Sequence, residues 1–116
     1  MHIETSDVVK IQITDVPRHD PIHVYLEDYG NKMGRITISE YGNSWTAFWP
    51  AMGSSLSDFI LKADNGYLTG YLAPALNIDS PKYERMDSRL NAVKEALRRL
   101  HAVHPMEPES KSNTES

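Results

Sequence analysis

The stretch "IHVYLEDYGNKMGRITISEYGNSWTAFWP", residues 22–50, decides the fold. Apolar and polar side chains alternate in residues 22–27 and again in 35–39, which is the pattern of half-buried strands. The turn residues of "GNKMG" (30–34) and the pair Gly42-Asn43 separate the strands, and Pro50 ends the last one because it has no N–H for a sheet hydrogen bond. The side chains expected to face the core are Ile22, Val24, Leu26, Ile36 and Ile38.

Upstream of this stretch, "VKIQI" (9–13) alternates in the same way, with Val9, Ile11 and Ile13 expected on the core face. Four consecutive short strands joined by brief turns predict an antiparallel meander with the order of the sequence.

Two helices are predicted downstream. The first lies within 53–66, with Ser55 as N-cap and Asn65-Gly66 as the stop signal. The second is residues 79–103, with Ser80 as N-cap and Pro81 as its first residue. Residues 67–76, "YLTGYLAPAL", contain a glycine and a proline and are read as a brief helical turn and a linker.

Together these elements predict an α+β domain in which a four-stranded antiparallel sheet carries two or three helices on one face. Residues 1–104 are expected to form this single domain. Residues 105–116 have almost no apolar side chains, so they are expected to be a disordered C-terminal tail.

The composition narrows the class of protein. The chain has 116 residues, no cysteine and a formal net charge of −4. It has no apolar run long enough to span a bilayer and no signal-peptide pattern, so we expect a cytoplasmic protein without membrane contact. Residues 82–99 carry six basic and three acidic side chains, and the rest of the chain therefore has a net charge of −7. A chain that is acidic outside one basic helix is not typical of a general nucleic-acid binder.

The aromatic residues of "YGNSWTAFWP" (41–50) have two roles in this prediction. Trp45 and Trp49 share a face of the last strand with Ala47 and are expected in the core. Phe48 points the other way. Tyr25, Phe48 and Tyr41 are therefore predicted to form an exposed partner-binding patch.

The long helix allows two interpretations of each of its faces. Its apolar residues recur every three or four positions, which fits either a core-facing stripe or the seam of a homodimer. Its basic residues either form a solvated face or contact phosphates. The apolar positions are Tyr83, Met86, Leu90, Val93, Leu97 and Leu100, and the basic positions are Arg85, Arg89, Lys94, Arg98 and Arg99.

No catalytic or metal-binding motif is identified, and no cofactor is expected. His19 beside Asp20 offers two members of a triad, but the sequence has no nucleophile-elbow pattern. His101 and His104 lie three residues apart at a helix end without a third ligand nearby in sequence.

Residues 34–74 resemble a set of small uncharacterised proteins from lambdoid phages and enterobacterial prophages. The resemblance rests on a G-R-I-T-I strand at Gly34–Ile38 and the Y-G-N-S-W-T-A-F-W segment at Tyr41–Trp49. It also includes A-M-G at Ala51–Gly53 and the Y-L-x-G motif that ends the segment Asn65–Gly70. The resemblance implies a phage accessory protein and carries no catalytic residues.

Two functions follow as expectations. The first is a non-enzymatic phage protein that binds a host macromolecule, foremost a host protein, and inhibits a defence or regulatory factor. The alternative is a nucleic-acid-associated accessory protein of phage replication or recombination that uses the basic helix.

Overall fold

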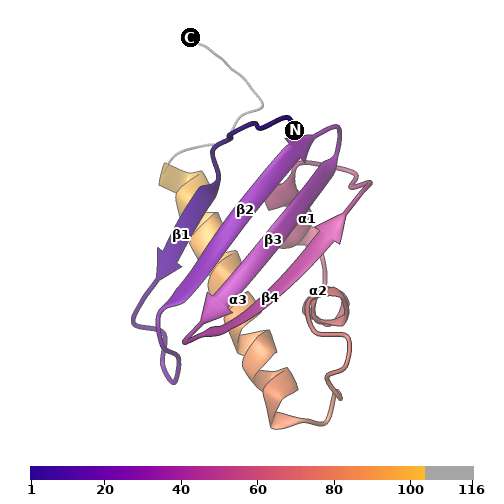
Figure 1. Ribbon diagram of the computed structural model, residues 1–116. Coiled ribbons are helices and arrows are strands. Elements are labelled where there is room, and N and C mark those ends of the chain that lie inside the picture. Colours follow the sequence, from indigo (N-terminus) through magenta and orange to yellow (C-terminus); the bar gives the residue numbers. More distant parts are fainter. Residues whose placement is uncertain (104–116) are drawn as a thin grey trace.

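The computed structural model describes residues 1–103, so the predicted tail at 105–116 lies outside the described residues. Four strands are followed by three helices (Figure 1). The strands are β1 (Val9–Ile13), β2 (Ile22–Gly30), β3 (Met33–Glu40) and β4 (Asn43–Trp49), and the helices are α1 (Leu56–Lys62), α2 (Asn65–Leu72) and α3 (Pro81–Val103). None of these helices is long and apolar enough to cross a membrane.

The sheet is an antiparallel meander with the order β1-β2-β3-β4, as predicted. The β2–β3 and β3–β4 hairpins each close through a pair of residues with positive φ. These are Asn31 and Lys32 (51° and 61°) between β2 and β3, and Tyr41 and Gly42 (48° and 83°) between β3 and β4. Two consecutive left-handed residues give the hairpin turn whose twist matches that of the flanking strands.

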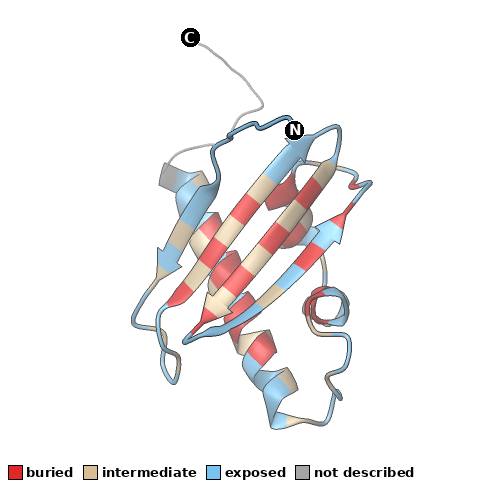
Figure 2. Ribbon diagram, viewed as in Figure 1, coloured by how far each residue is buried: buried red, intermediate tan, exposed pale blue. Residues whose placement is uncertain are grey.

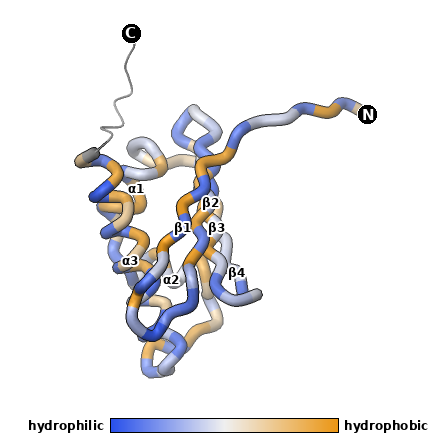
Figure 3. Tube along the Cα trace, turned by 90° about the vertical axis from the view of Figure 1, so that its left-hand side faces the viewer, coloured by the Kyte–Doolittle hydropathy of each residue, from blue (hydrophilic) through white to orange (hydrophobic). Residues whose placement is uncertain are grey.

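All three helices lie on the same side of the sheet, and no element of residues 1–103 covers the other side (Figure 3). The predicted α+β class is therefore confirmed. Residues 1–8 have no regular structure and extend away from the body of the domain.

The core lies between the sheet and α3. Buried and half-buried residues alternate along most of β2 and along β3 (Figure 2), and the five residues predicted to face the core are all buried. On α3 the apolar stripe packs against this layer, so its main role is in the core rather than in a dimer seam. Leu100, near the end of the stripe, is 37% exposed. The core residues that α3 contributes are Met86, Leu90, Val93 and Leu97.

Strand β1 is less buried than its alternation predicts. Ile11 and Ile13 are half-buried and Val9 is exposed. The reason is its position at the edge of the sheet, where it pairs with β2 alone and meets only the C-terminal part of α3 (Figure 1).

Two predicted helix caps are confirmed, and one predicted helix end is wrong. The Ser55 side chain accepts a hydrogen bond from the Asp58 N–H, and the Ser80 side chain accepts one from the Lys82 N–H. The Asn65-Gly66 pair does not end a helix. Asp64 caps a new helix by accepting from the Gly66 N–H at 3.0 Å, so 65–72 is a complete helix where we expected a turn and linker.

Candidate binding surface

The side of the sheet that the helices leave uncovered, here called the outer face, carries every second residue of the strands. Its three aromatic rings are Tyr25, Tyr29 and Phe48, and its other side chains are a mixture of Ser and Thr with charged and larger polar residues. The strand register places Lys10, Tyr25, Thr37 and Thr46 in one row, and Glu27, Arg35 and Phe48 in the next.

Two of these three rings have a cation beside them. The Arg35 guanidinium lies 5.5 Å from the centre of the Phe48 ring, and the Lys10 ammonium lies 5.7 Å from the centre of the Tyr25 ring. The one carboxylate in these rows, Glu27, accepts a hydrogen bond from the Tyr29 hydroxyl at 2.7 Å, and this bond raises the pKa of Tyr29. Lys10 and Arg35 therefore give the outer face a local excess of positive charge.

Two polar atoms on the outer face are buried without a hydrogen-bond partner among residues 1–103. They are Nδ1 of His23 and Nε of Arg35. Buried polar atoms usually have a partner, because losing their hydration without one costs free energy. Both atoms have almost no area exposed to solvent, so they do not mark contacts for a docking molecule.

The structure brings together part of the predicted patch. Phe48 is 40% exposed and its ring contacts Tyr29, with 6.2 Å between ring centres, rather than Tyr25 in the neighbouring row. Tyr41 is 81% exposed but lies in the β3–β4 turn, at the opposite end of β4 from Phe48. Tyr29 was not among the predicted residues although it continues the alternation of Tyr25 and Glu27, because Asp28 interrupts the apolar pattern on the opposite face of β2.

A second aromatic cluster lies on the helix side of the sheet. Trp49 is buried, as predicted, and packs against Phe59 and against Tyr67 and Tyr71 of α2. Its indole N–H donates to the Tyr67 hydroxyl at 3.2 Å, and a hydrogen bond with Tyr67 raises the pKa of Tyr71. The sequence analysis missed these two tyrosines because it did not predict a helix at residues 67–76. In α2 they lie one helical turn apart and so face the same way.

The basic side chains of α3 do not form one continuous stripe. Arg89 and Lys94 are buried, and Lys94 donates to the Ala63 carbonyl at the end of α1. Burial lowers the pKa of Lys94. Arg98 and Arg99 are exposed and both pair with Glu95 on the same helix. The predicted phosphate-binding set is therefore divided between the interior and solvent.

Arg85 and Arg89 converge on Glu40, which is only 3% exposed at the end of β3. One carboxylate oxygen accepts from Arg89 Nε at 2.6 Å and from His19 Nδ1 at 3.0 Å. The other accepts from the Asp20 N–H at 3.0 Å and from Arg85 at 3.2 Å. Burial acts to raise the pKa of Glu40, but the hydrogen bonds from Arg89, His19 and Asp20 outweigh it and lower the pKa to about 2. This carboxylate joins the β1–β2 loop, the sheet and α3.

The order Ser88–His19–Glu40 resembles that of a hydrolase triad, since His19 Nε2 accepts from the Ser88 hydroxyl at 2.9 Å. The sequence had suggested Asp20 as the carboxylate, and the structure places Glu40 there instead. Ser88 lies within α3, however, where backbone N–H groups are used in the helix and are not free to form an oxyanion hole. We therefore interpret these contacts as a structural network, and the expectation that the protein is not an enzyme stays a prediction.

Metal binding has no support among residues 1–103, where no three His, Asp or Glu side chains gather as ligands. His104, one of the two histidines considered from the sequence, lies outside the described residues.

A family model described as a phage family (Phage_phiTE_072) matches residues 1–104. The chain belongs to this phage family. Comparison with curated proteins gave no match, and comparison with solved structures gave none.

The match spans the whole described domain of this phage protein, which is more than the 34–74 segment that carried the sequence resemblance. Two glycines of that segment have a structural reason. A Cβ at Gly34 would lie 3.1 Å from side-chain atoms of Leu56 and Met52, and Gly42 holds a φ of 83° in the hairpin turn. The narrower assignment to lambdoid phages and enterobacterial prophages stays a prediction.

Proposed function

We propose that this phage protein is a non-enzymatic binding protein whose outer face docks on a host protein in the bacterial cytoplasm. The observation that carries the proposal is that residues 1–103 leave one whole side of the sheet uncovered (Figure 3), and that the aromatic side chains of Tyr25, Tyr29 and Phe48 lie on this side with few charged groups. Aromatic and arginine side chains contribute most of the binding energy in many protein interfaces. A domain of this size with one such face acts by occupying its target, so we infer inhibition of a host defence or regulatory factor.

The chemistry of the face favours a particular kind of partner surface. Glu27 is already bonded to Tyr29, whereas Lys10 lies beside the half-buried Tyr25 ring and Arg35 beside the exposed Phe48 ring. An apolar patch flanked by acidic side chains would therefore complement it.

A protein partner is favoured over nucleic acid because of how the basic residues are used. Affinity for nucleic acid rests on many phosphate contacts, and Arg89 and Lys94 are held inside the domain. We expect no binding to a short DNA or RNA at physiological salt. Micromolar binding that weakens steeply with salt would instead support the nucleic-acid alternative.

The test is a comparison of three forms of the protein as bait in host lysate treated with nuclease. Wild type and the control Ile78→Glu, an apolar-to-acidic change at an exposed position away from the sheet, should retain the same host protein. Phe48→Glu should remain folded and lose that protein. Once the partner is purified, we expect Phe48→Glu to weaken its binding at least tenfold. Equal retention by all three forms would rule out the outer face.

The oligomeric state is measured first, because a second copy can also occupy an aromatic face. A homodimer could form through the apolar stripe of α3 or through the Phe48 face, and the burial of the α3 stripe leaves the sheet as the larger candidate surface. Sedimentation equilibrium of wild type, Phe48→Glu and Arg98→Glu separates the two interfaces. A dimer that only Phe48→Glu dissociates would make the outer face a self-association surface.

A further inference from the structure

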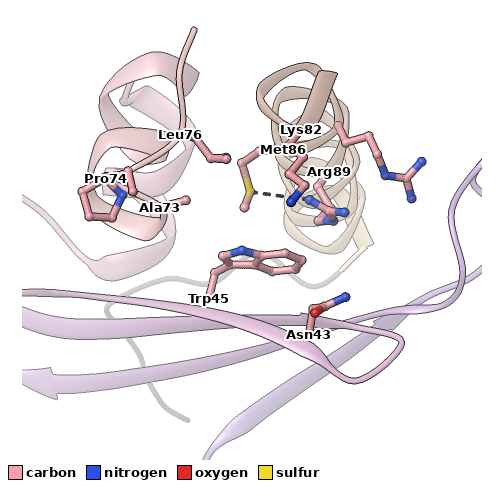
Figure 4. Close-up of a pocket in the computed structure, with 10 residues that line it drawn as sticks. Asn43, Trp45, Ala73, Pro74, Leu76, Lys82, Met86 and Arg89 are labelled. Carbon is pink, nitrogen blue, oxygen red and sulfur yellow. Dashed lines mark hydrogen bonds between the residues drawn. The ribbon is translucent and has the colours of Figure 1, made fainter. Parts of the chain in front are cut away.

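A separate cavity of about 520 Å³ lies on the helix side of the sheet, between the start of β4, the segment after α2 and the first turns of α3. Figure 4 shows the Trp45 ring as its floor. Leu76 and Ala73 point into it from one side, and Lys82, Met86 and Arg89 approach it from α3 on the other. Its volume is within the range of small-molecule sites.

The walls of the cavity are mostly apolar, and the charged groups that line it are basic. The Arg89 guanidinium stacks 4.3 Å from the centre of the Trp45 ring, and its Nη1 lies 4.0 Å from the Met86 sulfur. Both arginines of the cavity share one carboxylate, Glu40. Lys82 is exposed at the rim, and within the described part of the chain no ion pair involves it. Three cations and one carboxylate leave the site with an excess of positive charge.

Arg85 retains hydrogen-bonding capacity at the mouth of the cavity. Its guanidinium donates to the Arg18 carbonyl at 3.1 Å and to Glu40, but it is about half exposed and has five N–H groups. A planar guanidinium and a nearby ammonium suit an anion with two or more oxygens, such as a carboxylate or a phosphate.

We propose that this cavity binds a small molecule made of a planar ring and an anionic group. The ring packs beside the stacked Trp45–Arg89 pair, between Leu76 and Met86, and the anion meets Lys82 and Arg85 at the rim. The apolar floor accounts for the ring, and the excess of positive charge accounts for the anion. This site uses the opposite side of the sheet from the outer face, so it does not depend on the proposed docking function.

The test uses probes that separate ring from charge and phosphate from carboxylate. AMP and indole-3-acetate are the anionic probes, and adenosine and indole-3-acetamide are their neutral counterparts. Isothermal titration calorimetry with the full chain measures the affinities. A ¹H–¹⁵N spectrum follows the two indole N–H signals, which Trp45→Phe assigns. We expect at least one anionic probe to bind saturably, to shift the Trp45 signal, and to bind at least tenfold more tightly than its neutral counterpart.

The contribution of the rim is tested with Lys82→Gln, and Arg98→Gln is the matched control because it removes one charge from the same helix away from the cavity. Lys82→Gln should weaken binding about tenfold and the control should not. Binding of AMP alone would indicate a purine phosphate as the ligand class, and binding of indole-3-acetate alone an indole carboxylate. The proposal is overturned if neither anion binds, if the neutral probes bind equally well, or if Lys82→Gln has no effect.

Discussion

Replacing Glu40 by glutamine keeps the shape of a buried side chain and removes the charge that Arg85 and Arg89 share. Glu40 accepts four hydrogen bonds, and two of their donors are guanidinium groups on α3. In the variant the buried Arg89 has no carboxylate partner among the residues around it. Removing one member of a buried ion pair is more costly than removing both, because the remaining charge stays away from water.

The magnitude follows from the pKa of Glu40, which falls from 4.5 to about 2 on folding. A tenfold change in proton affinity corresponds to about 1.4 kcal/mol, so the ionised carboxylate stabilises the fold by about 3 kcal/mol. Because the folded pKa is the lower one, this stabilisation is complete above about pH 5. It is lost as the pH falls through 4.5 toward 2.

Urea unfolding of wild type and Glu40→Gln at several pH values measures this contribution. We expect the variant to be less stable by about 3 kcal/mol at pH 7, and the difference to shrink as the pH falls toward 2. Glu95→Gln is the control, since the Glu95 carboxylate is half exposed and pairs only with exposed arginines, and it should have little effect. A difference that is absent at pH 7, or that is equal at pH 7 and pH 2, would refute this account of the network.

Three further predictions concern stability and are measured by the same unfolding assay. Trp49→Ala should lower the free energy of unfolding by about 3–5 kcal/mol because it empties the centre of an aromatic cluster. Phe48→Ala on the outer face should lower it by no more than about 1 kcal/mol. Similar losses for the two variants would contradict the assignment of the two faces. Gly34→Ala should destabilise by about 1 kcal/mol because its Cβ would lie 3.1 Å from the buried side chains of Leu56 and Met52, which must shift. Gly70→Ala, open on α2, should stabilise by about 0.5–1 kcal/mol. Ser88→Ala should cost about 1 kcal/mol by removing the hydrogen bond to His19, and unchanged partner binding by this variant would agree with a structural role.

The sheet and two of the helices could be predicted because their signals are local. Alternation in β2 and β3 marks the buried face, and the serines before α1 and α3 mark the helix starts. The start of α2 was missed because Asn65-Gly66 also fits a helix stop, and only the hydrogen bond from the Gly66 N–H to Asp64 distinguishes the two. Glycine at position 66 also has a packing reason, since a Cβ there would lie 3.2 Å from the Tyr83 hydroxyl.

The hydrogen-bond network around Glu40 was less predictable than the fold, because it depends on where α3 crosses the sheet. Glu40 lies 49 positions before Arg89 and 21 after His19, and no local pattern links these residues. The same crossing buries Arg89 and Lys94, which spacing alone assigned to a solvent-facing basic stripe. Periodicity identifies which residues share a helix face, but it does not show which part of that face the rest of the chain covers.

The alternation of β4 connects the two proposed surfaces. Trp45 forms the floor of the cavity on the helix side, and Phe48, three residues later, is exposed on the outer face. A shift of one residue in strand pairing would exchange the two sides, so the register of β4 is essential to both surfaces. The Tyr41-Gly42 turn sets this register, because its two positive φ values define a two-residue hairpin that pairs Asn43 with Glu40. Glu40 is also the carboxylate that binds Arg85 and Arg89 beside the cavity. One short turn therefore fixes the positions of Phe48 on the outer face, of Trp45 at the cavity floor and of the Glu40 carboxylate.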